Sequence, residues 1–119
     1  HRLMHENKFI YAKIHKIHHR ANSPIPIDYM YVHPLEWMSG FIGPFIGILI
    51  LGGVSIYSFW LYLLVRNFHE LVIHSGLRNT FIKLPFYGTN EHHDIHHAKR
   101  EGNYASTFTL WDIVLKTKL

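Results

Sequence analysis

The longest uncharged stretch of the sequence is Trp37–Val65, 29 residues without lysine, arginine, aspartate or glutamate. A bilayer-spanning helix needs about 20 apolar residues, so this stretch exceeds one crossing and makes two only if its flanks contribute. The pair Gly52-Gly53 near its middle predicts a turn between two helical arms, Pro34–Leu51 and Val54–His74. Each arm would be roughly 27 Å or longer, close to the hydrocarbon thickness of roughly 30 Å. We therefore expect an all-α integral-membrane protein built on a transmembrane helical hairpin.

The charge distribution agrees with a membrane setting. The net charge is +4 with neutral histidines, 48% of residues are apolar and 17% are charged. Basic residues lie on both sides of the apolar centre, which favours anionic lipid headgroups over nucleic acid as the partner. The sequence has no cysteine, which excludes disulfides, thiolate metal ligands and a cysteine nucleophile.

Twelve histidines are present, and eight of them fall into three spaced boxes. On a helix, residues at i, i+3 and i+4 share one face, so a His-x-x-His-His segment brings three imidazoles together. Neutral imidazole nitrogen is a ligand for zinc, copper, iron and nickel. One such pair would suit a solvated helix end, but the recurring spacing predicts a metal site. The boxes are His1 with His5, then His15, His18 and His19, and finally His93, His96 and His97.

The site constrains the path of the chain. We expect one helix over residues 1–20 with a bend at Glu6-Asn7-Lys8, a loop over Ala21–Pro26, and a helix that begins at His33-Pro34, with Glu36 as a local cap or ion pair in its first turn. A second loop is expected over Arg78–Thr89, and the helix with the last box should end at Lys99–Gly102. Boxes on both sides of the hairpin can share metals only if the chain crosses the membrane an even number of times. Lysines and arginines that flank both arms place the two ends, and the histidine-rich helical cap, on the cytosolic side.

The segment from His69 to His74 contains a His-Glu pair, as zinc proteases do. Their motif has histidines at i and i+4, whereas these two are five residues apart, so that interpretation fails. Further candidates for metal ligands or for residues that support the ligands are His69, Glu70, His92, His33 and Asp112. Asp112 either accepts the second ring N–H of a ligating histidine or lies on the surface.

The three boxes together resemble those of the fatty-acid hydroxylase and sterol desaturase superfamily of membrane-bound, non-haem di-iron oxygenases. The resemblance extends from the first residue almost to the last and includes Asn103-Tyr104 and Trp111-Asp112, with a slight preference for sterol-modifying members. It implies that His74, before Ser75-Gly76, is a ninth ligand. It also implies O2-dependent hydroxylation or desaturation of a sterol or fatty acyl chain, and electrons from a separate cytochrome b5-type protein or NAD(P)H-dependent reductase. No residue beyond the metal ligands is assigned a catalytic role.

The number of histidines favours two metals that share four or five ligands each. Zinc has no redox chemistry, so we expect two iron ions, for which zinc can substitute in purified protein. Two other functions stay open: a membrane module for metal transport or storage, and a non-catalytic scaffold that retains the histidine boxes.

We expect a single domain over 1–119, a fragment that lacks upstream membrane helices. Its parts would be 1–33 with the first two boxes, 34–75 with the hairpin, and 76–119 with the last box. The expected location is the endoplasmic reticulum membrane in a eukaryote or the inner membrane in a bacterium.

Overall fold

A computed structural model describes residues 1–77 and 85–119. Within those ranges all regular elements are helical, and β pairing is limited to an isolated bridge between Tyr87 and Phe108. The all-α prediction is therefore confirmed for the described residues. The elements in chain order are α1 (Arg2–Glu6), α2 (Lys8–Lys13), η1 (His15–Arg20), η2 (Pro26–Met30), α3 (Pro34–Ser39), α4 (Ile42–Ile50), α5 (Ile56–Ile73), α6 (Asn90–Lys99) and α7 (Leu110–Val114), where η marks a 3₁₀ helix.

The N-terminal segment bends twice. Asn7 has extended backbone angles and caps α2, where its side chain accepts hydrogen bonds from the backbone N–H groups of Phe9 and Ile10, both at 3.0 Å. This break confirms the predicted bend at Asn7. A second break at Ile14 separates α2 from η1. The two bends divide the expected single helix into three short ones, which turn both N-terminal histidine boxes toward the interior.

Two prolines shape the connection to the hairpin. The predicted loop is confirmed from Ala21 to Ile25. Its predicted last residue, Pro26, is instead the first residue of the 3₁₀ helix η2. Pro34 occupies the first position of α3, and His33 caps that helix through its Nδ1 atom, which accepts a hydrogen bond from the Leu35 N–H at 3.1 Å. The predicted helix start at His33-Pro34 is confirmed.

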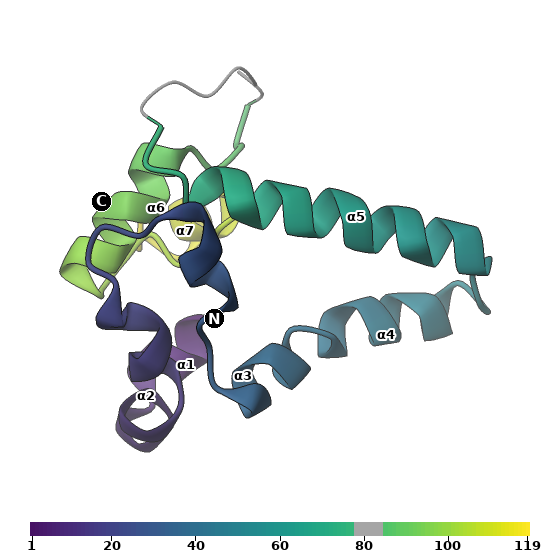
Figure 1. Ribbon diagram of the computed structural model, residues 1–119, viewed down its shortest axis with the longest axis horizontal. Coiled ribbons are helices and arrows are strands. Elements are labelled where there is room, and N and C mark those ends of the chain that lie inside the picture. The colour runs from purple at the N-terminus through teal and green to yellow at the C-terminus, as the bar shows by residue number, and fades with distance from the viewer. Residues whose placement is uncertain (78–84) are drawn as a thin grey trace.

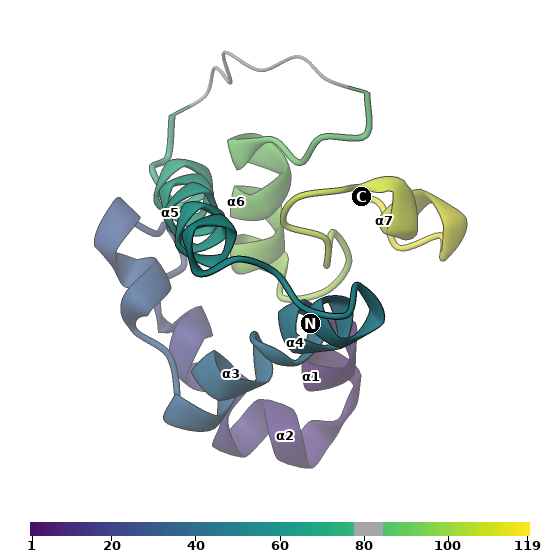
Figure 2. The same cartoon turned by 90° about the vertical axis from the view of Figure 1, so that its right-hand side faces the viewer.

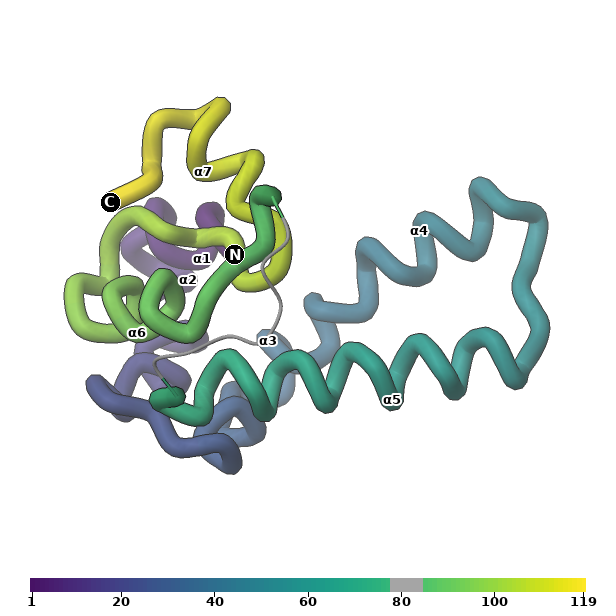
Figure 3. The backbone as a smooth tube through the Cα atoms, turned by 90° about the horizontal axis from the view of Figure 1, so that it is seen from above, coloured from purple at the N-terminus to yellow at the C-terminus, as the bar shows by residue number. Residues whose placement is uncertain are grey.

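Helices α4 and α5 form an antiparallel pair that projects from the rest of the molecule (Figure 1). The turn between them contains Gly52 and Gly53, whose φ angles of 70° and 115° favour glycine. Figure 3 shows from above that the first arm is interrupted, since α3 ends before α4 begins. Within the two described ranges, no helix combines the length and the apolar character needed to cross a membrane.

The C-terminal half folds back over the body. Helix α6 lies beside the C-terminal end of α5, and the segment with α7 lies on the other side of α6 (Figure 2). As predicted, α6 ends at Lys99–Gly102, where Arg100 adopts a left-handed conformation with φ 62°. A loop was predicted over Arg78–Thr89; residues 78–84 lie outside the described residues, and residues 85–89 contain no helix.

The interior of the described structure is polar. Its buried hydrophobic core consists of Ile73, whereas most of the other buried side chains belong to histidines, with Asn90, Asn103, Thr109 and Asp112 among the rest. Large apolar side chains are exposed instead, most of all Tyr57 at 83%, Ile50 at 80% and Leu49 at 79% around the tip of the hairpin. A domain with so little buried apolar surface needs another source of stability, and bound metal is one such source.

Candidate metal centre

Nine histidines converge inside the body and form two clusters. In each cluster, one ring nitrogen per histidine lies within 4.8 Å of the corresponding nitrogen of every other member. The first cluster consists of His1, His5, His15, His19 and His96; the second consists of His18, His74, His93 and His97. The structure brings together the nine residues that the sequence predicts as ligands, in groups of five and four.

Each His-x-x-His-His box divides between the two clusters. On α6, His96 and His97 diverge by about 100° around the helix axis, so His96 reaches the first cluster while His97 joins His93 in the second. On η1, His18 belongs to the second cluster, whereas His15 and His19 belong to the first. Helices α6 and η1 therefore lie between the clusters and contribute histidines to both. The α1 segment contributes histidines to the first cluster only, and the end of α5 contributes one to the second.

Ring nitrogens face one another at distances that hydrogen bonds do not explain. His15 Nε2 lies 2.8 Å from His5 Nε2, 3.0 Å from His1 Nε2 and 3.1 Å from His19 Nε2. In the second cluster, His93 Nε2 lies 3.0 Å from His74 Nε2 and 3.2 Å from His97 Nε2. A neutral imidazole carries a single N–H, so one atom cannot be paired with three others of its kind.

The opposite ring nitrogens show where the protons are. Five Nδ1 atoms donate to acceptors outside the clusters: His1 to the Tyr104 carbonyl at 2.5 Å, His15 to Glu36 Oε1 at 2.7 Å, His74 to the Glu70 carbonyl at 2.8 Å, His96 to the Gly102 carbonyl at 2.8 Å, and His97 to the Ala21 carbonyl at 3.1 Å. Their Nε2 atoms are then unprotonated, with lone pairs directed at one another. His96 Nε2 is buried and has no hydrogen-bond partner within the described structure.

A metal ion at the centre of each cluster fits this arrangement. Ligands about 2.0–2.1 Å from a metal and at right angles to one another are about 3 Å apart, the spacing found here. In metal-bound histidines generally, the ring nitrogen that does not bind the metal donates a hydrogen bond, and this bond fixes the tautomer. The Nδ1 hydrogen bonds found here are of that kind. The donor set is entirely imidazole, which suits zinc, copper, iron or nickel better than magnesium or calcium.

Burial favours the neutral form of most of the clustered imidazoles. It is the main cause that lowers the pKa of His18 to about 2, that of His96 to about 3, and those of His5 and His97 to about 4. Neighbouring histidines lower each pKa further, and the pKa values of His19 and His93 are lowered for the same reasons. The rings are therefore in the protonation state that binds metal at neutral pH.

Three other candidate histidines have partners outside the clusters. His33 caps α3. The His69 ring lies between two hydroxyl groups, with Nδ1 2.7 Å from the Tyr87 oxygen and Nε2 3.0 Å from Thr107 Oγ1. His92 Nε2 donates to Asp112 Oδ2 at 3.2 Å.

The two candidate carboxylates are placed differently. Asp112 accepts from His92, from the backbone N–H groups of Tyr104 and Ala105, and from Thr117, so it joins α6 to the C-terminal segment rather than supporting a member of either cluster. Glu70 supports His74 through its backbone carbonyl, while its Oε2 atom lies 3.9 Å from His74 Nδ1.

Glu36 has a role that the sequence did not predict. It is the carboxylate that receives the His15 proton, 21 residues away along the chain. The sequence predicts for Glu36 only a local cap or ion pair at the start of α3. Its second oxygen, Oε2, is buried without a partner in the described part of the chain. No spacing rule signals the contact, because an irregular connection and η2 separate the two residues.

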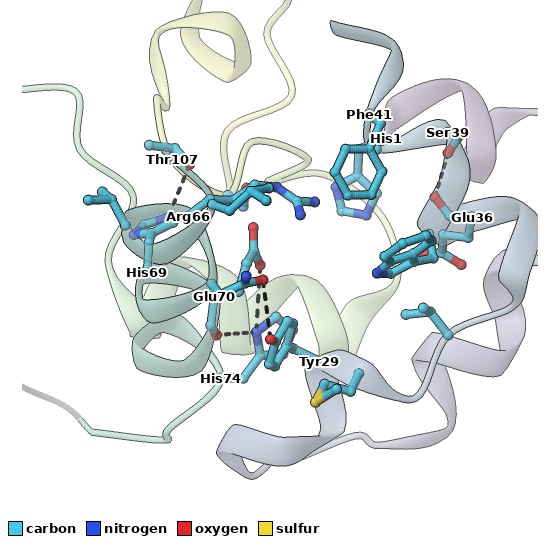
Figure 4. A pocket seen from close by; sticks show the side chains of 18 of the residues that line it. His1, Tyr29, Glu36, Ser39, Phe41, Arg66, His69, Glu70, His74 and Thr107 are labelled. Carbon is cyan, nitrogen blue, oxygen red and sulfur yellow. Dashed lines mark hydrogen bonds and ion pairs between the residues drawn. The ribbon is translucent and has the colours of Figure 1, made fainter. Parts of the chain in front are cut away.

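A cavity of about 1340 Å³ lies against both clusters. Figure 4 shows that His1 and His74, one from each cluster, border it together with Glu36, Arg66 and Glu70. His15, His18 and His93 also line it. Where it extends toward the hairpin, the wall becomes mostly apolar and consists of Trp37, Phe41, Leu61, Tyr62, Leu63 and Val65. The cavity can therefore hold an apolar molecule with one end against the histidines.

Comparison with known proteins gives the same family along nearly the whole chain. Residues 1–117 match the family model described as fatty acid hydroxylase. Methylsterol monooxygenase 1 of Rattus norvegicus is 42% identical over 120 residues, which cover 98% of this chain and 40% of the relative. Methylsterol monooxygenase erg25B of Aspergillus fumigatus is 34% identical over 125 residues, or 99% and 42% of the two chains.

A third relative, very-long-chain aldehyde decarbonylase GL1-10 of Oryza sativa, is 36% identical over 123 residues, which cover 98% of this chain and 40% of the relative. The chain thus spans about 40% of the length of the curated relatives that it matches. No solved structure matches it significantly. The family model and the histidine boxes agree, and the chain belongs to the fatty acid hydroxylase family.

Proposed function

We propose that this chain forms the metal-binding part of a di-iron oxidoreductase that uses O2 to hydroxylate or desaturate a membrane lipid, with a sterol favoured over a fatty acyl chain. The observation that carries the proposal is the pair of all-histidine clusters at one end of an apolar cavity. The names of the rat and fungal relatives, methylsterol monooxygenases, support a sterol substrate.

The nine clustered histidines would hold two ions, five ligands on one and four on the other. When bound, iron supplies the reduction of dioxygen and the oxidation of an unactivated C–H bond, which zinc cannot supply because it has no redox chemistry. Glu36 and four backbone carbonyls hold the Nδ1 protons, so that the Nε2 lone pairs of five ligands stay available. The apolar wall binds the lipid and excludes water from the site.

The α4–α5 hairpin is proposed to be embedded in lipid. Its exposed side chains are large and apolar, and they include Ile50, Tyr57 and Leu61. Such a surface is costly in water and favourable in hydrocarbon. The histidine clusters, and the lysines and arginines at both ends of the chain, would lie on the cytosolic side, at the endoplasmic reticulum in a eukaryote or the inner membrane in a bacterium. The division into 1–33, 34–75 and 76–119 follows from this arrangement.

A separate protein is proposed as the electron donor. The sequence has no Gly-x-Gly-x-x-Gly motif for a dinucleotide. Reducing equivalents would come from NAD(P)H through a reductase or a cytochrome b5-type protein.

The test is lipid profiling in a host that expresses the full-length protein containing this chain. Wild type should convert a sterol or fatty acid into a product that mass spectrometry detects as a hydroxylated or desaturated species. His93→Ala with His96→Ala removes one ligand from each cluster and should abolish the product, whereas Lys99→Ala, exposed on the same helix, should not. An unchanged lipid profile with wild type that binds metal would contradict the oxygenase and favour a storage module or scaffold.

A further inference from the structure

Two opposite charges on α5 border the cavity without pairing. Arg66 and Glu70 are four residues apart, a spacing at which such side chains usually meet on a helix surface. Within the described structure, neither forms an ion pair with the other within 4.0 Å, and the one acid–base contact of Glu70 is the 3.9 Å approach to His74. Figure 4 shows both side chains directed into the same space.

Arg66 is held away from Glu70 by the opposite wall. Its guanidinium carbon lies 5.6 Å from the centre of the Phe41 ring, a cation–π contact. Its Nη2 atom lies 3.0 Å from the position that a Cβ on Gly40 would take, so the guanidinium rests against the α3–α4 junction. The side chain thus spans the cavity from α5 to the other arm.

The two groups offer complementary hydrogen-bonding capacity. A guanidinium only donates, and an ionised carboxylate only accepts. A lipid carboxylate would pair with Arg66 but meet repulsion from Glu70 and from Glu36, which lines the same cavity. A hydroxyl group can accept from Arg66 and donate to Glu70 at once, and it carries no charge. Of the polar groups that lipids carry, the hydroxyl satisfies both side chains.

We infer that Arg66 and Glu70 form a subsite that binds the hydroxyl group of a lipid alcohol and thereby determines which lipids are positioned at the clusters. The inference rests on the proposed function. Glu70 lies one turn before His74, so a hydroxyl at Glu70 is on the order of 6 Å along α5 from the second cluster. The carbon presented to the metals is then close to the hydroxyl-bearing carbon rather than at the far end of the lipid.

The test is equilibrium binding to the full-length protein in detergent, loaded with zinc so that no turnover occurs. One set of ligands is a 3-hydroxysterol, its methyl ether, which accepts but does not donate, and its deoxy analogue, which does neither. A long-chain alcohol with its methyl ether and its alkane forms the second set, so that the two sets separate a sterol source from a straight-chain source.

Wild type should bind at least one alcohol about 10-fold or more tightly than its ether and its deoxy analogue, since a hydrogen bond to a charged group contributes at least about that factor to affinity. Glu70→Leu should remove the preference for alcohol over ether, and Arg66→Leu should remove the preference for ether over deoxy analogue. Arg66→Lys keeps a charged donor and should restore part of that preference. Phe68→Leu is the matched control, because Phe68 is exposed on α5 and does not line the cavity.

Equal binding of alcohol, ether and deoxy analogue by wild type would overturn the subsite, as would full discrimination in Glu70→Leu and Arg66→Leu variants that retain wild-type zinc content. Glu70→Met, which is close in size to glutamate and has no oxygen to accept the hydrogen bond, replaces Glu70→Leu if the latter does not fold. Failure of the proposed subsite can be distinguished from failure of the proposed oxygenase activity. Discrimination without an oxidised product contradicts the oxygenase alone, and an oxidised product without discrimination contradicts the subsite alone.

Discussion

His96 and His97 are neighbours in sequence but belong to different histidine clusters, with ring centroids 5.9 Å apart and planes at 82°. Each contributes its Nε2 side to a separate group and donates its Nδ1 proton to a different backbone carbonyl, that of Gly102 or Ala21. One turn of α6 therefore supports both proposed metal sites.

Single substitutions at these two positions should remove different metals. We predict that His96→Ala and His97→Ala each lower the iron content of the full-length protein from about two ions per chain toward one, since each leaves the other cluster complete. Metal analysis gives the count, and iron spectroscopy of the two variants should show different remaining sites. Lys99→Ala serves as the control. Loss of both ions from either variant would mean that the clusters act as one site.

Glu36 should determine how tightly the first cluster holds its metal. It accepts the Nδ1 proton of His15 at 2.7 Å, and loss of such a partner typically costs about 10- to 100-fold in metal affinity. We predict that Glu36→Ala weakens one of two binding steps by that factor, and that Glu36→Gln, which retains an acceptor oxygen, weakens it less. Competition with a chelator measures both steps. Unchanged affinity in Glu36→Ala would show that the hydrogen bond does not support the ligand.

The metal-free protein should be destabilised by acid. Burial lowers the pKa of His96 to about 3 and those of His5 and His97 to about 4, from 6.5 in the unfolded chain. Between pH 6.5 and those values the unfolded state binds more protons than the folded state, so the free energy of unfolding falls as pH falls through this window. Thermal unfolding of metal-free protein should show a Tm that is constant above about pH 7 and drops steadily from 6.5 to 4.

The metal-loaded protein should respond differently. Protons do not compete for the buried ring nitrogens until well below pH 6, so folded protein should retain its metal at pH 5. A Tm of the metal-free protein that does not change between pH 7 and pH 4 would contradict the neutral state of these histidines.

The hairpin can be tested with single cysteines, since the chain has none of its own. In membranes, and with any cysteines elsewhere in the full-length protein replaced by serine, Lys8→Cys and Lys118→Cys should react with an impermeant reagent from the same side. Tyr57→Cys, at the exposed tip of α5, should be shielded until detergent is added. Labelling of Lys8→Cys and Lys118→Cys from opposite sides would refute the shared cytosolic site.

The hairpin turn and the eight histidines of the boxes could be predicted because each has a local signal, whereas His74 was predicted only from the family resemblance. A glycine pair in an uncharged stretch marks the turn, and the spacing of the histidine boxes depends only on helix periodicity. The division of each box could not be predicted in the same way. Three histidines near one helix face are compatible with a single site, and only the elements packed on either side of η1 and α6 separate His18 from His19 and His96 from His97.

Contacts between segments that are distant in the chain could not be predicted from the sequence either. The Glu36–His15 hydrogen bond depends on the path of an irregular connection. The contact of the Arg66 side chain with Gly40 and Phe41, at the break between α3 and α4, joins residues about 25 positions apart that no local pattern links. The sequence predicts elements and ligand types well, whereas partners of the ligands require the tertiary structure.

The spacing of two metals tests the central claim most directly. Each cluster consists of histidines alone, and among the described residues no carboxylate belongs to either one. Imidazole nitrogens do not bridge two ions, and bridging oxygen ligands are what hold paired metals at about 3.5–4 Å. X-ray diffraction at the iron absorption edge from iron-loaded, full-length protein should therefore show two peaks clearly more than about 4 Å apart, one within each cluster. A single peak, or a carboxylate-bridged pair at shorter distance, would contradict the account.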